Sequence, residues 1–382
     1  MKADCGLWIT EFGLRILAAL FVCLLPLSSP AQSGRKTPNT PKNPQDKVDL
    51  RIETREVRMP IRAYNNVGKP VTDLAPKDVV IIEDGTARQT TSIKFEPANI
   101  LLVLDVSNEI GTFKNGESDR NNIYVDEKDY EKPEHGDMLP RKTTPILTQP
   151  APREFAYNVV DNLAATDRIA IIQYSDKVQL IQDWTLDRKQ ARGALDSKFR
   201  TGIQSTFHDA MTLAAKKLDD CKTGRRVMIL LSDGLDSASK TTRGKALEAL
   251  MKTETSIFVV SWTELLRSEI IKAMQWNGVQ ERQDNRTFKR QGELAAFLHK
   301  LDGQEIELKG LAEITGGEFY LPTRFKFFLR QPTEILKDIG AQYTLTYLTE
   351  REFVDTSFRS VQVLAARSGL TVKARQRRYS GD

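Results

Sequence analysis

The sequence Ile100-Leu-Leu-Val-Leu-Asp-Val-Ser-Asn-Glu109 decides how the rest of this chain is interpreted. It opens with an uninterrupted apolar run, a pattern typical of a strand buried on both faces of a parallel sheet. Asp105 and Ser107 follow where that strand passes into a loop. Loops at the carboxyl edge of a parallel sheet collect ligand-binding side chains, because the sheet holds them rigidly. We therefore expect a carboxylate and a hydroxyl to begin a binding site here.

Two later stretches repeat this arrangement. The apolar run Val227–Ser232 predicts a second buried strand and leads into an aspartate. Between the two strands, Gly202-Ile-Gln-Ser-Thr206 precedes an amphipathic helix predicted over 207–219. The three stretches together offer four hard oxygen donors: Asp105, Ser107, Thr206 and Asp233. Donors of this kind suit Mg²⁺, Mn²⁺ or Ca²⁺ and do not suit zinc or copper.

The three patterns Asp-X-Ser, Gly-X-X-X-Thr and Leu-Ser-Asp-Gly, in this order, resemble the metal-ion-dependent adhesion site (MIDAS) of von Willebrand factor A domains. The resemblance implies a doubly wound, mostly parallel α/β sheet of Rossmann-like type. It also implies a divalent cation, Mg²⁺ first and Ca²⁺ or Mn²⁺ as alternatives. That ion would accept an acidic side chain from a partner protein or an extracellular matrix component.

One position departs from the family pattern. The family continues to a second serine where this chain has Glu109. Glu109 would face away from the ion, stand in for the partner's carboxylate, or favour Ca²⁺, which takes more ligands. If Glu109 joined the ion, three carboxylates would give the site a net negative charge, which would repel a partner carboxylate. A site that binds no metal, with an acidic edge that is only structural, is a further alternative.

A narrower resemblance covers most of the chain outside the first 47 residues. Two sequence segments are similar to the region that precedes the A domain in acidobacterial-type VWFA-related secreted proteins. They are Gly68-Lys-Pro-Val-Thr-Asp-Leu-Ala-Pro-Lys-Asp78 and Glu83-Asp-Gly85. Ile314-Thr-Gly-Gly-Glu-Phe-Tyr320 resembles the same group.

The N-terminus has the pattern of a secretory signal peptide. Lys2 and Arg15 precede an apolar core of about a dozen residues, Ile16–Leu27, and small residues follow it. This core is shorter than the roughly 20 residues that span a bilayer as a helix, although an uncleaved anchor is the alternative. We expect a secreted, periplasmic or cell-envelope protein without a stable membrane span after cleavage. Cleavage would leave Cys221 alone, which excludes an internal disulfide and argues against a zinc site.

The domain organisation follows from changes in composition. The +5 net charge is mild for 382 residues and gives no nucleic-acid footprint, whereas 40% hydrophobic residues are enough for a sizeable core. The expected segments are a signal peptide (1–31), a disordered linker (32–47), a β module (48–97), the A domain (98–322) with insertions at about 110–153 and 263–303, and a C-terminal helix with strands (323–382).

Strands and helices alternate through the A domain, which predicts a parallel sheet covered on both faces. Helices are expected over 154–164, 188–199, 207–219, 243–251, 304–315 and 333–342, and strands over 169–174, 178–184, 227–232, 257–262 and 318–321. No glycine-rich phosphate loop follows these strands, which argues against nucleotide binding. Strands expected over 343–348, 360–365 and 370–374 alternate apolar and polar residues, and we expect them to pack with 48–97 as one small β sandwich.

These patterns favour a binding protein over an enzyme. The first hypothesis is an adhesion-type protein that uses a cation to engage a partner carboxylate, and the alternative is a metal-independent scaffold or assembly protein of the same fold. A hydrolase is the third hypothesis, since a nucleophilic serine needs a base and the histidines are His135, His208 and His299. The basic segment Lys373–Arg378 is interpreted as a set of charges that keep an edge strand soluble.

Overall fold

The computed structural model describes residues 53–107, 150–268, 270–271, 285–351 and 357–380. The predicted signal peptide, the linker, Glu109 and nearly all of the 110–153 insertion lie outside these residues. Among the helices described, none combines the length and apolar composition needed to cross a membrane.

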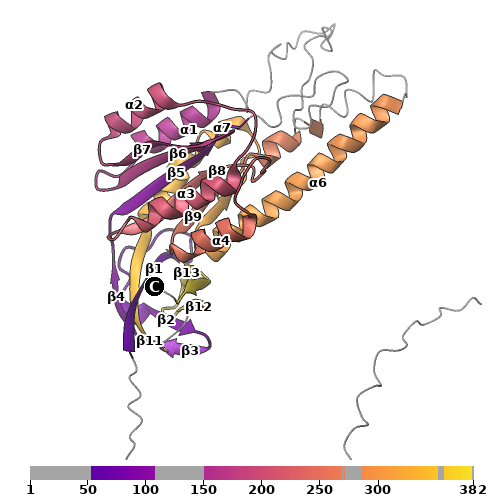
Figure 1. Cartoon of the computed structure of the whole chain (residues 1–382). Helices are drawn as coiled ribbons and strands as arrows, with labels where there is room; N and C mark the ends of the chain where they lie inside the picture. Colours follow the sequence, from indigo (N-terminus) through magenta and orange to yellow (C-terminus); the bar gives the residue numbers. More distant parts are fainter. Residues whose placement is uncertain (1–52, 108–149, 269, 272–284, 352–356, 381–382) are drawn as a thin grey trace, which may run out of the picture. The chain divides into compact units, whose positions relative to one another are not determined.

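The centre of the fold is a six-stranded sheet in the order β10-β9-β8-β5-β6-β7 (Figure 1). Its strands are β5 (Ala98–Asp105), β6 (Arg168–Tyr174), β7 (Val178–Thr185), β8 (Arg225–Leu231), β9 (Ser256–Val260) and β10 (Glu318–Tyr320). All neighbours pair in parallel except β6 and β7, which pair antiparallel. Every residue of β5 is buried, since strands flank it on both sides and helices cover both faces. The predicted α/β fold with a mostly parallel sheet is therefore confirmed.

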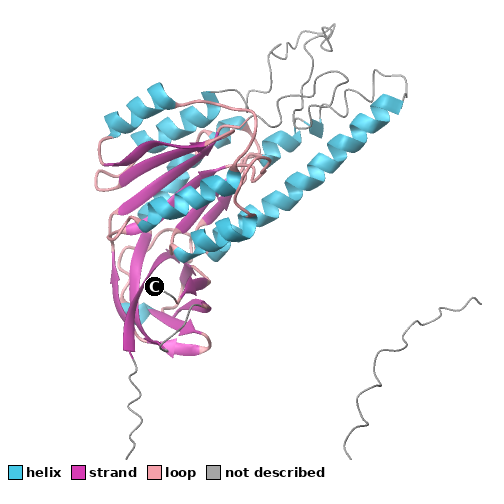
Figure 2. Ribbon diagram, in the orientation of Figure 1, coloured by secondary structure: helices cyan, strands magenta, loops and turns pink. Residues whose placement is uncertain are grey.

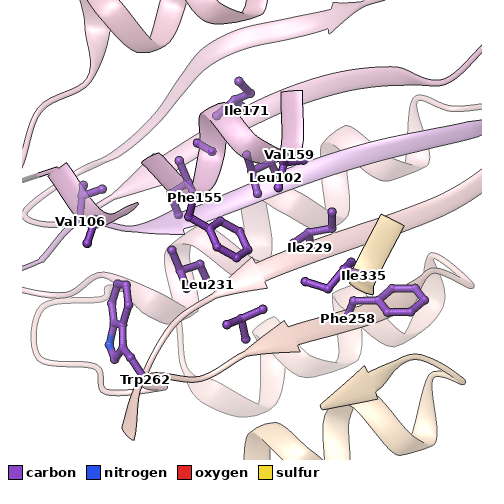
Figure 3. Packing of buried hydrophobic residues seen from close by; sticks show 14 of the residues in the cluster. Leu102, Val106, Phe155, Val159, Ile171, Ile229, Leu231, Phe258, Trp262 and Ile335 are labelled. Carbon is purple, nitrogen blue, oxygen red and sulfur yellow. The ribbon is translucent and has the colours of Figure 1, made fainter. Parts of the chain in front are cut away.

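Helices cover both faces of the sheet (Figure 2). They are α1 (Pro150–Asp161), α2 (Arg188–Lys198), α3 (Phe207–Asp219), α4 (Arg243–Lys252), α6 (Asn285–Ile314), α7 (Phe325–Phe328) and α8 (Gln331–Gly340). On one face, Leu102 of β5 belongs to a cluster with Phe155 of α1 and Ile335 of α8 (Figure 3). On the other, Val103 belongs to a cluster with Met211 of α3. Successive strand residues point to opposite faces, so β5 serves both clusters.

Strands from both ends of the described chain form two four-stranded sheets, in the orders β13-β1-β11-β4 and β14-β12-β2-β3. The strands are β1 (Glu53–Asn65), β2 (Val79–Glu83), β3 (Thr86–Arg88), β4 (Thr90–Lys94), β11 (Gln342–Arg351), β12 (Phe358–Ala365), β13 (Leu370–Ala374) and β14 (Arg377–Tyr379), and a short 3₁₀ turn covers Pro76–Asp78. Met59, Ile81, Leu345 and Val361 share one buried cluster. The expected antiparallel module built from both flanks is thus present, whereas the domain limits at 98 and 322 stay predictions.

Two helices begin earlier than expected. The helix predicted over 304–315 starts at Asn285, so much of the segment read as a second insertion is the first half of α6. Leu294, Leu301 and Leu308 are buried and recur every seven residues, a stripe hidden among charged and amide side chains. Helix α1 starts at Pro150 and not at 154, in keeping with the preference of proline for the first turn.

The interpretation of the C-terminal arginines as soluble edge charges is wrong at two positions. Arg375 and Arg378 are only 1% and 4% exposed. Arg378 Nε donates to Glu83 Oε1 at 2.6 Å, and Arg375 Nη2 donates to the Met251 carbonyl at 3.3 Å. The sequence does not show which hydrogen-bond acceptors the fold brings near an arginine. An arginine that becomes buried therefore cannot be distinguished in the sequence from one that stays in water.

Candidate metal centre

Asp105 ends β5 with its carboxylate fully buried and held by three donors. Its Oδ1 accepts hydrogen bonds from the backbone N–H of Ser107 at 3.0 Å and from the Ser107 hydroxyl at 2.6 Å. Its Oδ2 accepts one from the Tyr174 hydroxyl at 2.9 Å. Hydrogen bonds of this kind favour the ionised form and fix its orientation. The carboxylate is therefore positioned before any ligand arrives.

The hydroxyls of Ser107 and Thr206 both direct their protons into the protein. Ser107 donates to Asp105, and Thr206 Oγ1 donates to the Ser175 carbonyl at 2.8 Å. A hydroxyl carries one proton and two lone pairs, so each oxygen keeps lone pairs for a cation. This is the orientation that a metal ligand needs.

Thr206 keeps this orientation although it is the N-cap residue of α3. The hydroxyl of an N-cap threonine usually accepts a hydrogen bond from a backbone N–H of the first helical turn. In α3, side chains of the loop after β8 accept these hydrogen bonds instead. The N–H of His208 donates to Asp236 Oδ1 at 3.2 Å, and the N–H of Asp209 donates to Ser239 Oγ at 3.1 Å. The start of α3 and the loop after β8 are thereby joined directly.

Asp233, after β8, is 4% exposed and accepts a hydrogen bond on Oδ1 from the Leu235 N–H at 2.9 Å. Burial, and then the negative charge of Asp233, raise the pKa of Asp105 well above its usual value. Two desolvated carboxylates that repel each other are unfavourable unless a positive charge balances them. The donor set, two carboxylates and two hydroxyls, fits a hard divalent cation.

The structure brings the predicted residues to one edge in different ways. Asp105 and Ser107 are in direct contact, the negative charge of Asp233 raises the pKa of Asp105, and Thr206 is joined to the end of β6 through Ser175. Glu109 lies outside the described residues. Within the described ranges, no group of three or more His, Cys, Asp or Glu side chains could hold a metal, so a cation here would depend on the hydroxyl ligands.

Sequence reasoning missed Tyr174, which ends β6 directly opposite Asp105. Its hydroxyl contacts Asp105 and, at 2.7 Å, Ser232 Oγ. In the sequence, Ser232 is only the last residue of the apolar run Val227–Ser232. The available signal was the position of Tyr174 at the end of a buried run that pairs with the first strand. The histidine nearest in sequence, His208, pairs with Asp236 at 3.4 Å and not with a serine hydroxyl, so the hydrolase hypothesis gains no base from it.

The loop before Thr206 is held close to the strand ends by a glycine. The N–H of Gly202 donates to the Val106 carbonyl at 3.2 Å. A Cβ at this position would lie 2.5 Å from Ser175 Oγ and 2.7 Å from Asp176 Oδ2. The Asp176 carboxylate also accepts from the N–H groups of Ile203 and Gln204, at 3.0 and 2.7 Å. A side chain at 202 would displace this loop.

Gly202→Ala should therefore lower the free energy of unfolding by about 1–3 kcal/mol, the usual cost of overpacking. The loss should be larger in Mg²⁺ than in EDTA, because displacement of the loop also moves Thr206. Urea unfolding in the two buffers measures both effects. Gly193→Ala is the control, since a Cβ there meets no atom within 4 Å and replaces a helical glycine. Equal unfolding curves for Gly202→Ala and wild type would contradict this packing.

Residues 150–297 match the family model of the von Willebrand factor type A domain. The match includes Thr206 and Asp233 and begins after the stretch with Asp105 and Ser107. The sheet and helices described above are the fold of this family, as the sequence predicts. A comparison with curated proteins gives no match.

Solved structures of low identity are similar to this chain. An aerotolerance-related membrane protein from Bacteroides fragilis is 13% identical, with 63% of this chain and 98% of that chain covered and a TM-score of 0.37. A von Willebrand factor type A protein from Catenulispora acidiphila is 11% identical, covering 84% and 72%, with a TM-score of 0.39. Proximal thread matrix protein 1 from the mussel byssus, with a zinc-occupied MIDAS motif, is 14% identical, covering 67% and 49%, with a TM-score of 0.39. The chain thus spans about half of the mussel protein.

Proposed function

We propose that this chain is a protein-binding module that engages its partner through a divalent cation at the carboxyl edge of the central sheet. Asp105, Ser107, Thr206 and Asp233 would hold the ion, and a remaining coordination position would take an acidic side chain of the partner. The observation that carries this proposal is the pair of buried carboxylates, Asp105 and Asp233, beside two hydroxyls whose protons point into the protein.

The electrostatics favour this use of the site. Two carboxylates balance the charge of a doubly charged ion. A further carboxylate from the partner can still be attracted, because the site is dry and the field of the ion is local. Mg²⁺ is the first candidate, and Ca²⁺ or Mn²⁺ would also accept these oxygens. The partner would be a protein or an extracellular matrix component. The signal-like segment before residue 32 supports a secreted, periplasmic or cell-envelope location. Membership of the acidobacterial-type group, which the sequence resembles, is part of this proposal.

Thermal unfolding with EDTA, Mg²⁺, Mn²⁺ or Ca²⁺ tests the cation. An ion that binds only the folded state stabilises it by about 2.7 kcal/mol at a concentration 100 times its Kd. We expect at least one ion to raise the midpoint of wild type and none to raise that of Asp105→Asn. In EDTA the variant should unfold at or above the wild-type temperature, because it removes a buried repelling charge.

Asp167→Asn is the matched control at the opposite end of β5. Asp167 is also buried, and its carboxylate accepts a hydrogen bond from the Ala98 N–H at 2.8 Å. This variant should lose stability equally with and without the ion. Wild-type midpoints that no ion moves at millimolar concentration would favour the metal-independent scaffold. If an ion does bind, Glu109→Ser shows whether Glu109 competes for it, by a change in Kd.

A further inference from the structure

Tyr174 is the one side chain among those described above that touches all three sequence stretches of the candidate site. Its hydroxyl lies 2.9 Å from Asp105 Oδ2 in the first stretch and 2.7 Å from Ser232 Oγ, next to Asp233, in the third. Its ring centroid lies 6.1 Å from that of Phe207, the residue after Thr206 in the second. A single buried tyrosine therefore connects strand β5, strand β8 and the start of α3.

The strand register explains this position. Asp105 stands opposite Tyr174 on β6, and Leu104 stands opposite Leu231 on β8, which places Ser232 beside Asp105. Side chains in register on neighbouring parallel strands point to the same face of the sheet. Tyr174 reaches past the Asp105 carboxylate to Ser232, while its ring belongs to the cluster that α3 covers.

The hydrogen bonds run in one direction. The N–H of Gly234 donates to Ser232 Oγ at 2.8 Å. Tyr174 has one hydroxyl proton, which it donates to Asp105 Oδ2. The Ser232 hydroxyl then donates to the Tyr174 oxygen. The chain of donors therefore starts at the peptide that follows Asp233 and ends on Asp105.

We propose that Tyr174 is a positioning residue that fixes the spacing of Asp105 and Asp233, and through Phe207 the place of Thr206, and so sets the affinity of the cation site. This inference rests on the proposed function. All three groups of the chain, Asp105, Tyr174 and Ser232, are 0% exposed, so water cannot replace the tyrosine hydroxyl. Without that hydroxyl, Asp105 loses its hydrogen-bonded link to Ser232, the residue that precedes Asp233.

Tyr174→Phe tests this because it removes the hydroxyl and keeps the ring. Loss of a group that orients a metal ligand typically weakens metal binding about 10–100-fold. We expect the Kd for Mn²⁺ to rise by that factor, measured by titration with electron paramagnetic resonance detection of the free ion. Ser232→Ala should shift the Kd in the same direction, and it serves as the test if Tyr174→Phe does not fold.

Tyr347→Phe is the matched control. Tyr347 is equally buried, and its hydroxyl donates to Glu83 Oε1 at 3.0 Å in the β module. This variant should lose stability in EDTA but bind Mn²⁺ with the wild-type Kd. An unchanged Kd in Tyr174→Phe, or an equal loss in both variants, overturns the positioning role and leaves the cation proposal standing. A wild type that binds no Mn²⁺ overturns the proposed function, and this inference with it.

Discussion

Glu83→Gln should lower the free energy of unfolding by about 3–5 kcal/mol at pH 7, the usual cost of removing one partner of a buried ion pair. Glu83 is 0% exposed inside the β module. Its Oε1 accepts from Arg378 Nε at 2.6 Å and from the Tyr347 hydroxyl at 3.0 Å, and its Oε2 accepts from the Thr349 hydroxyl. The variant leaves the 4% exposed Arg378 with no opposing charge from Glu83, which explains the size of the loss.

The contribution of Glu83 to stability depends on pH, because its pKa differs between the folded and unfolded states. Burial raises the pKa of Glu83, but hydrogen bonds from Thr349 and Arg378 outweigh it and hold the pKa below its usual value. Between the two pKa values the unfolded chain binds more protons than the folded one. The contribution of Glu83 is therefore complete above the unfolded value of about 4.3 and is lost as the pH falls through the folded value. The stability gap between wild type and variant should narrow in urea unfolding below about pH 4.

A double-mutant cycle separates the ion pair from general damage. Replacement of a whole buried pair is often neutral, so Glu83→Gln combined with Arg378→Met should recover most of the loss seen in either single variant. Additive losses in the double variant would show that the two side chains act independently. That result would mean that the unpaired charge of Arg378 does not cause the large loss of stability expected for Glu83→Gln.

The candidate site could be located from the sequence because its residues follow apolar runs. The runs before Asp105 and Asp233 specify buried parallel strands, and the carboxyl ends of such strands meet at one edge. Tyr174 could not be assigned in the same way, because its contact with Asp105 depends on β6 being the neighbour of β5. Strand order is a property of the whole sheet, and a tyrosine that ends an apolar run looks like an ordinary core residue.

Arg375, Arg378 and the first half of α6 depend in the same way on contacts that only the tertiary structure provides. Both arginines become buried because β14 and the turn before it approach Glu83 and Met251, which are distant in the sequence. The helix over 285–303 has polar residues around most of its surface, and its leucine stripe gains a partner only when the sheet is formed. The local composition of the C-terminal segment and of the first half of α6 favours loops, but burial against the rest of the protein overrides this preference.

Gly317→Ala should produce the second large loss of stability, about 3 kcal/mol or more. A Cβ on Gly317 would lie 1.8 Å from the carbonyl oxygen of Ile257 and 2.4 Å from its carbonyl carbon. These are backbone atoms of β9, which cannot rotate away as a side chain can. Relief of the clash would have to separate β10 from β9, which pair from Glu318 opposite Phe258 onward.

The same substitution should also loosen the β module. The 0% exposed Arg62 of β1 donates through Nη2 to the carbonyl oxygens of Gly316 and Gly317, at 3.2 and 2.5 Å. Displacement of this turn would leave a buried guanidinium without two of its acceptors, which is costly in a site that water does not reach. We therefore expect both groups of strands to unfold at lower urea concentration in Gly317→Ala, and fluorescence and circular dichroism should report the same shift.

Gly310→Ala is the control, since it places the same methyl group in α6 where no atom lies within 4 Å. Replacement of a helical glycine by alanine usually stabilises a protein by roughly 0.4–1 kcal/mol. Opposite signs for the two substitutions would show that the close approach of the Gly316–Gly317 turn to β9, and not the loss of glycine flexibility, determines the outcome. A Gly317→Ala protein as stable as wild type would mean that β10 can leave β9 at little cost, and that Arg62 does not need the turn to hold the β strands.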